Sequence, residues 1–307
     1  MVHKFLDNGI EYLIQENSFT DIVCVQCWVK VGSINENKNQ RGMSHLIEHM
    51  LFKGTKKRKV GEIAKIIEHC GGDINAYTSF DKTVYHLSIN PEHIETAIDI
   101  LSDAIFYSTF DTNELKKEKE VICEEIRRYL DDPSSMIIEK TFSYAFCGTE
   151  AARPIIGYEK DIKKFSKAEI LKFYNLWYRP DNISVVVLGN IDIEQTEILI
   201  NKYFGKISKP KFNKNIFTQK LIQRQFPKGI TTHIIKGDFK KSRLQTSFKA
   251  PHFENLEAIA LDLAMFSFGG AQSSRLVRNI QDTLQLVSEV DASLYAPKFG
   301  GITIIHS

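Results

Sequence analysis

The spacing of apolar and polar residues predicts strands mixed with long helices over the first two thirds of the chain. Apolar residues alternate with polar ones in LDNGIEYLIQEN, DIVCVQCWVKVGS and INAYTSFDKTVYHLSI, which predicts strands and a hairpin. Helical spacing follows at about 91–107, 111–130, 134–146 and 166–176, before the strand ISVVVLGNI and the helix DIEQTEILINKYFGKI. Strands and helices mixed without strict alternation predict an α+β fold.

A similar order of elements begins again after a polar stretch. Residues 209–228 are polar, basic and marked by proline, as linkers between domains often are. A strand-like segment from about residue 232, the helix NLEAIALDLAMFSFGG, the short helix SSRLVRNIQD and further strands follow. We therefore expect two homologous mixed sheet-plus-helices domains, at 1–208 and 229–307. The second is expected to be incomplete, because the chain ends at Ser307 within a strand pattern.

Composition mainly excludes classes of function. The 43% hydrophobic and 25% charged residues are typical of a globular protein, and a net charge of +2 gives no basis for a nucleic-acid partner. The basic run at 53–59 is interpreted as a solvated loop. No segment approaches the ~18 apolar residues of a membrane span. The N-terminus lacks the apolar run of a secretory signal, so the expected location is cytoplasmic or organellar, unless a leader is missing.

The five cysteines are scattered and odd in number, which does not indicate a disulfide framework. Cys24 and Cys27 form a CxxC pair within a predicted strand. Side chains three positions apart on a strand face opposite sides. Core packing is therefore favoured over a redox or zinc role for this pair.

The segment RGMSHLIEHMLFKGT at 41–55 carries His45, Glu48 and His49 at its centre, three groups able to bind or transfer protons within a predicted apolar helix. At ~100° per residue, His45 and His49 lie about 40° apart, and Glu48 lies about 60° from His45. Burying these groups without partners is costly. A shared metal removes that cost, since two histidines four positions apart can bind one Zn²⁺. Two core histidines bonded to the backbone are the alternative.

A hydrolytic zinc site usually takes three protein ligands, and the predicted helix at 111–130 offers several acids. Glu118 and Glu125 fall in its apolar stripe, together with Val121, Ile122, Ile126 and Tyr129. Glu120 and Glu124 point the other way. Periodicity alone does not rank Glu118 and Glu125 as ligands.

These motifs resemble the M16 metallopeptidases, the family of pitrilysin, insulin-degrading enzyme and mitochondrial processing peptidase. HLIEH is the inverse of the commoner HExxH, and Glu125 follows His49 by 125 − 49 = 76 positions. The resemblance continues in GGDINAYTS, EKEVICEEIRRYLDDP, RPIIG and WYRPDNISVVVLGNID, and in FGGAQSSRLVRNI of the second domain. The form is closer to fused, double-length bacterial members than to the small processing-peptidase subunits.

The resemblance implies a zinc-dependent endopeptidase (HxxEH type) that hydrolyses extended or unfolded peptides. One Zn²⁺ per chain would be held by His45, His49 and Glu125. Glu48 would take a proton from the zinc-bound water and pass it to the leaving amine. Glu118, on the same face as Glu125, would complete the catalytic set by supporting the ligands.

The resemblance also implies a place for the substrate. Asn75, Ala76 and Tyr77 are expected on the sheet edge to which an extended peptide adds as a strand. Arg275 stands in place of the family's substrate-facing arginine. Ser288 stands where the family often has a substrate-contacting tyrosine, and GTEAAR lacks the His-Pro often found before RPIIG. These departures leave open how the second domain binds, but do not affect the zinc site.

The expected partners are a peptide substrate and either a missing C-terminal half or a second M16-like subunit; a homodimer is a further arrangement. The main alternative function is a non-catalytic structural or regulatory M16-like subunit. It is less favoured because His45, Glu48, His49 and Glu125 are all present, whereas such subunits usually lose part of this set. A metal-binding protein without peptidase activity is a second alternative.

Overall fold

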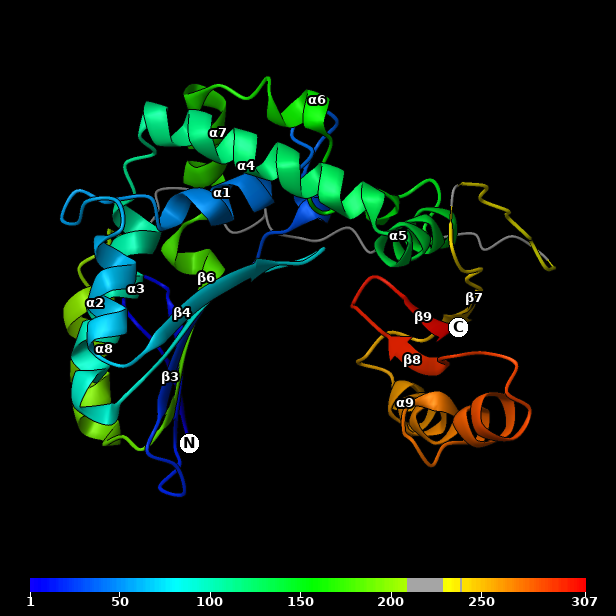
Figure 1. Ribbon diagram of the computed structural model, residues 1–307. Coiled ribbons are helices and arrows are strands. Elements are labelled where there is room, and N and C mark those ends of the chain that lie inside the picture. The colour runs from blue at the N-terminus through cyan, green and yellow to red at the C-terminus, as the bar shows by residue number, and fades with distance from the viewer. Residues whose placement is uncertain (209–228, 238) are drawn as a thin grey trace. The chain divides into compact units, whose positions relative to one another are not determined.

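The computed structural model describes residues 1–208, 229–237 and 239–307, so the expected linker at 209–228 lies outside the described residues (Figure 1). Contacts group the described residues into two compact units. Unit 1 contains residues 1–126 and 154–208, and unit 2 contains residues 127–153 together with those from 229 onwards. The segment 127–153 therefore groups with the last part of the chain rather than with the residues on either side of it.

Unit 1 is built on a six-stranded mixed sheet. Neighbouring strands are antiparallel, except β2 and β6, which are parallel. β4 lies at one edge, so one row of its backbone N–H and C=O groups has no neighbouring strand in the sheet. In sheet order, the strands are β1 (Val2–Phe5), β2 (Glu11–Glu16), β6 (Ile183–Gly189), β3 (Val23–Val29), β5 (Thr83–Ile89) and β4 (Asp73–Thr78).

Seven α-helices of the described chain begin in this unit, and the mixture confirms the α+β prediction. In Figure 1, α2, α3 and α8 lie along one side of the sheet, while α1, α4 and α7 lie together above it. The helices are α1 (Met43–Leu51), α2 (Glu62–His69), α3 (Ile94–Tyr107), α4 (Thr112–Asp131), α6 (Glu159–Ile162), α7 (Lys167–Trp177) and α8 (Ile193–Phe204).

The core of unit 1 follows the apolar pattern of the sequence. Alternate residues of β3, from Val23 to Val29, are fully buried, while those between them are half-buried. Cys27 lies in the buried set and Cys24 in the other, so the two side chains point to opposite faces. The apolar side chains of α1 are all at most 1% exposed: Met43, Leu46, Ile47, Met50 and Leu51. Burial of each such side chain contributes roughly 1.5–3 kcal/mol.

The start of α1 is fixed by a close backbone contact with a distant segment. Gly42 caps the helix at a φ of +86°, and a Cβ there would lie 2.6 Å from the carbonyl oxygen of Ile156. A Cβ on Gly157 would lie 2.7 Å from the Cα of Gly42. The buried Glu36 carboxylate accepts hydrogen bonds from the N–H groups of Gly42 and Ser44, each at 2.8 Å. The RPIIG and RGM segments therefore meet where the helix begins.

Unit 2 has a three-stranded antiparallel sheet in the order β7-β9-β8. The strand expected from about residue 232 is wrong for the described residues before Gln245, which form no strand. The expected short helix includes a π-helical turn at Val277–Thr283. The other elements are α5 (Pro133–Ala145), β7 (Gln245–Ala250), α9 (Leu256–Gly269), β8 (Asp291–Tyr295) and β9 (Gly301–His306).

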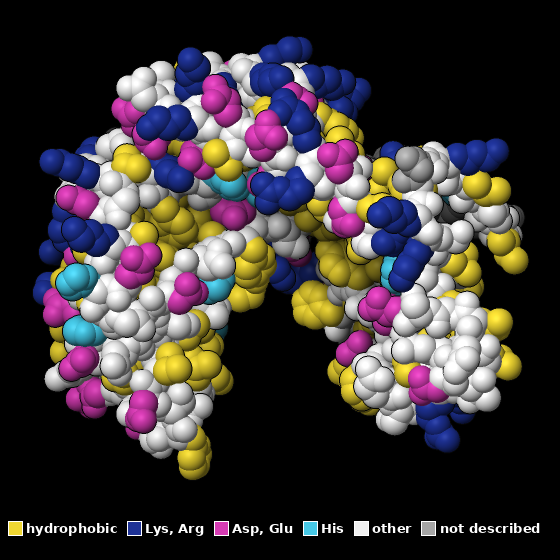
Figure 2. Space-filling view, in the orientation of Figure 1, with side chains coloured by type: hydrophobic (Ala, Val, Ile, Leu, Met, Phe, Trp, Pro, Cys, Tyr) yellow, Lys and Arg dark blue, Asp and Glu magenta, His cyan; other side chains and the backbone are white. Residues whose placement is uncertain are grey.

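The surface carries charges of both signs and one apolar helix face. Figure 2 shows basic and acidic side chains interspersed over the face in view. On α9, Leu256, Ile259, Leu263 and Phe266 are each more than half exposed. Within the described residues, none of the helices has the length and apolar character needed to cross a membrane.

Candidate metal centre

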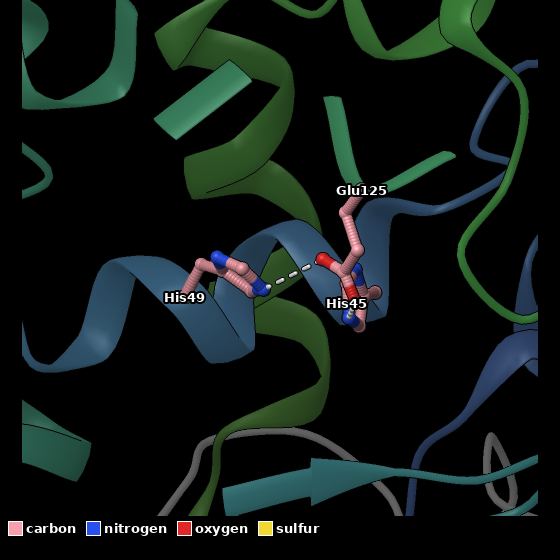
Figure 3. A group of neighbouring side chains, drawn as sticks. All are labelled: His45, His49 and Glu125. Atoms are coloured by element: carbon pink, nitrogen blue, oxygen red, sulfur yellow. Dashed lines mark ion pairs between the residues drawn. The ribbon is translucent and has the colours of Figure 1, made fainter. Parts of the chain in front are cut away.

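Two helices bring the three predicted ligands together. His45 and His49 project from the same face of α1, and their ring centroids lie 4.7 Å apart. Glu125, on α4, points at both imidazoles (Figure 3). One ligand atom from each residue lies within 4.8 Å of the other two. In the described residues, this is the only group of three histidine, cysteine or acidic side chains that meets this spacing.

The spacing of these atoms suits a shared ion better than direct hydrogen bonds. Nε2 of His45 lies 3.9 Å from Oε1 of Glu125, and Nε2 of His49 lies 3.6 Å from Oε2. Both distances exceed the 2.7–3.2 Å of an N–H···O hydrogen bond. They are close to the ~3.3 Å that separates two ligands placed ~2.0–2.1 Å from a tetrahedral zinc ion. The residues present therefore fit a tetrahedral metal ion.

His45 is in the form that a metal requires. Burial lowers its pKa to about 3, so the imidazole is neutral at ordinary pH. Its buried Nδ1 has no hydrogen-bond partner in the described part of the chain. Nε2 is the ring nitrogen that faces Glu125, so an ion shared with Glu125 would bind Nε2 and would leave Nδ1 as it is.

Glu118 lies beside His49 rather than facing the gap between the three donors. Its Oε2 lies 3.2 Å from Nδ1 of His49, and its Oε1 lies 2.8 Å from the ammonium group of Lys53. The Glu118 side chain is only 7% exposed, against 42% for Glu125. The two acids of the apolar stripe therefore occupy different places, one against the outer nitrogen of His49 and one facing both rings.

Glu48 is held by the edge strand of the sheet. The hydroxyl of Thr78, the last residue of β4, donates a hydrogen bond to Oε2 of Glu48. Burial raises the pKa of Glu48, and the hydrogen bond from Thr78 acts in the opposite direction by favouring the carboxylate. A carboxyl group with a raised pKa, close to His49, suits an exchange of protons with a bound group.

The residues expected to face a substrate lie in two units. Asn75, Ala76 and Tyr77 lie in β4, at the sheet edge, and the side chains of Asn75 and Tyr77 are exposed. Oδ1 of Asn75 accepts a hydrogen bond from the N–H of Ala76. Arg275 and Ser288 lie in unit 2. Arg275 lines a shallow hollow of about 320 Å³ with Ser267, Ser273, Arg278 and Asn279.

Sequence reasoning missed two residues of this centre. Thr78 lies in the GGDINAYTS motif, but nothing in its strand pattern indicates a contact with Glu48. Lys53 lies in the expected loop, but nothing in the sequence indicated its ion pair, and the solvated-loop interpretation is wrong for Arg58. Lys53 pairs with Glu118, and Arg58 is only 9% exposed and pairs with Asp99 and Asp103.

The apolar stripe on α4 is also narrower than expected. Leu115, Ile122, Cys123 and Ile126 are buried, but Val121 is 49% exposed. Val121 therefore lies at the margin of the stripe, and its place on the helical wheel did not predict burial.

Comparisons with known proteins connect this arrangement to peptidases. The sequence profile described as "Insulinase (Peptidase family M16)" matches residues 12–159, and that described as "Peptidase M16 inactive domain" matches residues 164–305. An "Uncharacterized zinc protease" of Rickettsia felis is 33% identical over 98% of this chain and 72% of the relative. The "Uncharacterized zinc protease YmxG" of Bacillus subtilis is 31% identical over 92% of this chain and 67% of the relative.

A solved structure is similar in fold. A protease from Helicobacter pylori superposes with a TM-score of 0.88, at 24% sequence identity. The match covers 99% of this chain and 74% of that protein. The likeness therefore extends over residues of both units.

Proposed function

This chain belongs to peptidase family M16, and from that membership we propose that it is a zinc-dependent endopeptidase acting on extended or unfolded peptides. One observation carries the proposal: two imidazoles and a carboxylate from α1 and α4 converge at ligand spacing. His45, His49 and Glu125 would hold one Zn²⁺ per chain. When bound, zinc would polarise the scissile carbonyl and lower the pKa of a water molecule to about 7.

The protein's own residues move the protons in this proposal. Glu48 takes a proton from the attacking water and later delivers it to the leaving amine. Thr78 holds the Glu48 carboxylate in place through its hydrogen bond. Glu118 orients the imidazole of His49 through Nδ1, which leaves Nε2 directed at the site.

The substrate would bind as an added strand at β4. Its backbone would pair with the segment Asn75–Tyr77, which lies at the open edge of the sheet. Pairing through the backbone fixes the register of a peptide while placing few demands on its side chains. Arg275 is proposed as a contact from unit 2. Folded proteins would be poor substrates, because a strand must be free before it can add to the edge.

Zinc content and peptide cleavage, measured on the same preparation, test this function. The wild type should bind one zinc and cleave an unstructured fluorogenic peptide. Glu48→Gln should keep zinc and lose roughly 10²–10⁴-fold in turnover. Glu120→Gln, an exposed acid on the far side of α4, is the matched control and should behave as wild type.

The alternatives give different results in the same assay. Zinc binding without cleavage in the wild type would favour a metal-binding protein that is not a peptidase. A folded wild type with neither zinc nor cleavage would favour a structural or regulatory subunit. Full activity in Glu48→Gln would remove Glu48 from the mechanism.

A further inference from the structure

We propose that Lys53 is a positioning residue of the metal centre: its ammonium group holds Glu118 in the place from which that carboxylate orients His49. The inference rests on the proposed zinc site. It concerns a residue that is not one of the three proposed ligands and that contacts Glu118.

The contacts connect three side chains in a row: Lys53, Glu118 and His49. Nζ of Lys53 lies 2.8 Å from Oε1 of Glu118, and Oε2 of Glu118 lies 3.2 Å from Nδ1 of His49. Each carboxylate oxygen thus has its own partner. An imidazole that donates from Nδ1 presents the lone pair of Nε2 to a metal, and a fixed partner at Nδ1 also fixes the plane of the ring.

Because Glu118 is buried, its ion pair with Lys53 is needed to keep the carboxylate in place. The Glu118 side chain is 7% exposed, and a buried carboxylate is stable only with close partners. In the described residues, Glu118 forms ion pairs with His49 and Lys53. Without Lys53, the carboxylate loses its only fully charged partner in this set. It then gains by turning towards water, and it leaves His49 without support.

The backbone places Lys53 independently of the rest of the basic run. It lies two residues after the end of α1 and one turn beyond His49, and its N–H donates to the carbonyl of Met50 at 3.1 Å. By contrast, Lys57 pairs with Asp99, and the side chain of Lys56 is exposed. The segment that directly follows the histidine-bearing helix therefore carries the cation that supports one of the histidines.

The test is a double-mutant cycle on zinc affinity, measured by competition with a chelator. Lys53→Met should weaken zinc binding roughly 10–100-fold, the range seen when groups that support metal ligands are lost. Lys53→Arg should restore most of the affinity, because a guanidinium also pairs with a carboxylate. Lys56→Met, which removes the same charge from the same loop, should leave the affinity unchanged. In a Glu118→Gln background, Lys53→Met should have little further effect.

A spectroscopic signature separates positioning from a general loss of structure. The cobalt(II)-substituted protein should show altered visible absorption bands in Lys53→Met, restored in Lys53→Arg, while the tryptophan fluorescence of unit 1 stays unchanged. If Lys53→Met does not fold, Lys53→Gln takes its place in the cycle.

Three results would overturn the inference. If Lys53→Met keeps the zinc affinity of the wild type, the positioning role of Lys53 is wrong but the proposed zinc site is unaffected. Equal losses from Lys53→Met with and without Glu118 would show that Lys53 does not act through that acid. A wild-type chain that binds no zinc would overturn both this inference and the proposed function.

Discussion

The two units each place an apolar helix after a strand, but only one of these helices is equipped for chemistry. α1 follows β3 and is buried over most of its circumference, with His45, Glu48 and His49 in one sector. α9 follows β7, contains no histidine, and leaves Ile259, Leu263 and Phe266 largely exposed. An apolar helix alone does not make a site.

The difference lies in the partners that surround the polar sector. Around α1, Glu125 faces both imidazoles, Glu118 supports His49, and Thr78 holds Glu48. The acids of α9, Glu257 and Asp262, are exposed. Buried ionisable groups in unit 1 are therefore tolerated because other elements supply matching groups, and this arrangement is what a metal centre requires.

Removing a metal ligand from α1 should have the largest effect on zinc binding. His49→Ala should abolish zinc binding, because two remaining ligands do not make a stable zinc site. His252→Ala, an exposed histidine close to α9, should leave the zinc content of the protein unchanged. Metal analysis of the two purified variants makes the comparison. A folded His49→Ala variant with one zinc would contradict the assignment.

Glu118 and Glu125, the two acids in the apolar stripe of α4, should contribute differently to zinc affinity. Glu125→Gln should cost most of the zinc affinity, because Glu125 faces both Nε2 atoms. Glu118→Gln should cost about 10–100-fold, as expected for a group that orients a ligand. Chelator competition measures both affinities. The reverse ranking would mean that the register of this helix is wrong by two turns.

Thr78→Val should change how cleavage depends on pH. The hydroxyl of Thr78 favours the charged form of Glu48 and so lowers its pKa. Removing it raises that pKa, so the base is protonated at a higher pH. The acid limb of kcat/KM should move upward by up to about one pH unit. Thr78→Ser, which keeps a hydroxyl, is the control. Identical pH dependence of kcat/KM for Thr78→Val and wild type would show that Thr78 does not set the pKa of Glu48.

The smallest expected effect concerns the start of α1. Glu36→Gln keeps the shape of the side chain but removes the charge that faces the N–H groups of Gly42 and Ser44. Unit 1 should lose about 1 kcal/mol of stability. Trp28 and Trp177 both lie in unit 1, so tryptophan fluorescence during urea unfolding reports on this unit. An unchanged midpoint would show that the helix start does not depend on this charge.

The periodicity of the sequence predicted the features that depend on a single helix or strand. It gave the alternation in β3, the polar sector of α1, and the shared face of Glu118 and Glu125. It could not show the contacts of Lys53 with Glu118 or of Thr78 with Glu48, because each joins residues far apart in sequence. Those contacts depend on how helices and strands pack, and a pattern along the chain does not contain that information.

The same limit explains the failed prediction around residue 232. A strand pattern describes side chains that would suit a sheet, but strand formation also needs a neighbour for pairing. In the described residues of unit 2, β7 begins at Gln245, opposite His306 in β9, and the residue before it, Leu244, exchanges backbone hydrogen bonds with Ser307. The alternation before that point is therefore not sufficient for a strand.

X-ray absorption spectroscopy of zinc bound to the wild-type chain tests the central claim most directly. Two kinds of zinc ligand are compared. One is the group of His45, His49 and Glu125 in unit 1, and the other is the set of five cysteines spread over the whole chain. We predict a shell of nitrogen and oxygen ligands at ~2.0–2.1 Å, with the outer-shell pattern of two imidazoles. That pattern should disappear in His49→Ala. Sulfur ligands at ~2.3 Å would contradict the account, because they would place the zinc on cysteines and not between α1 and α4.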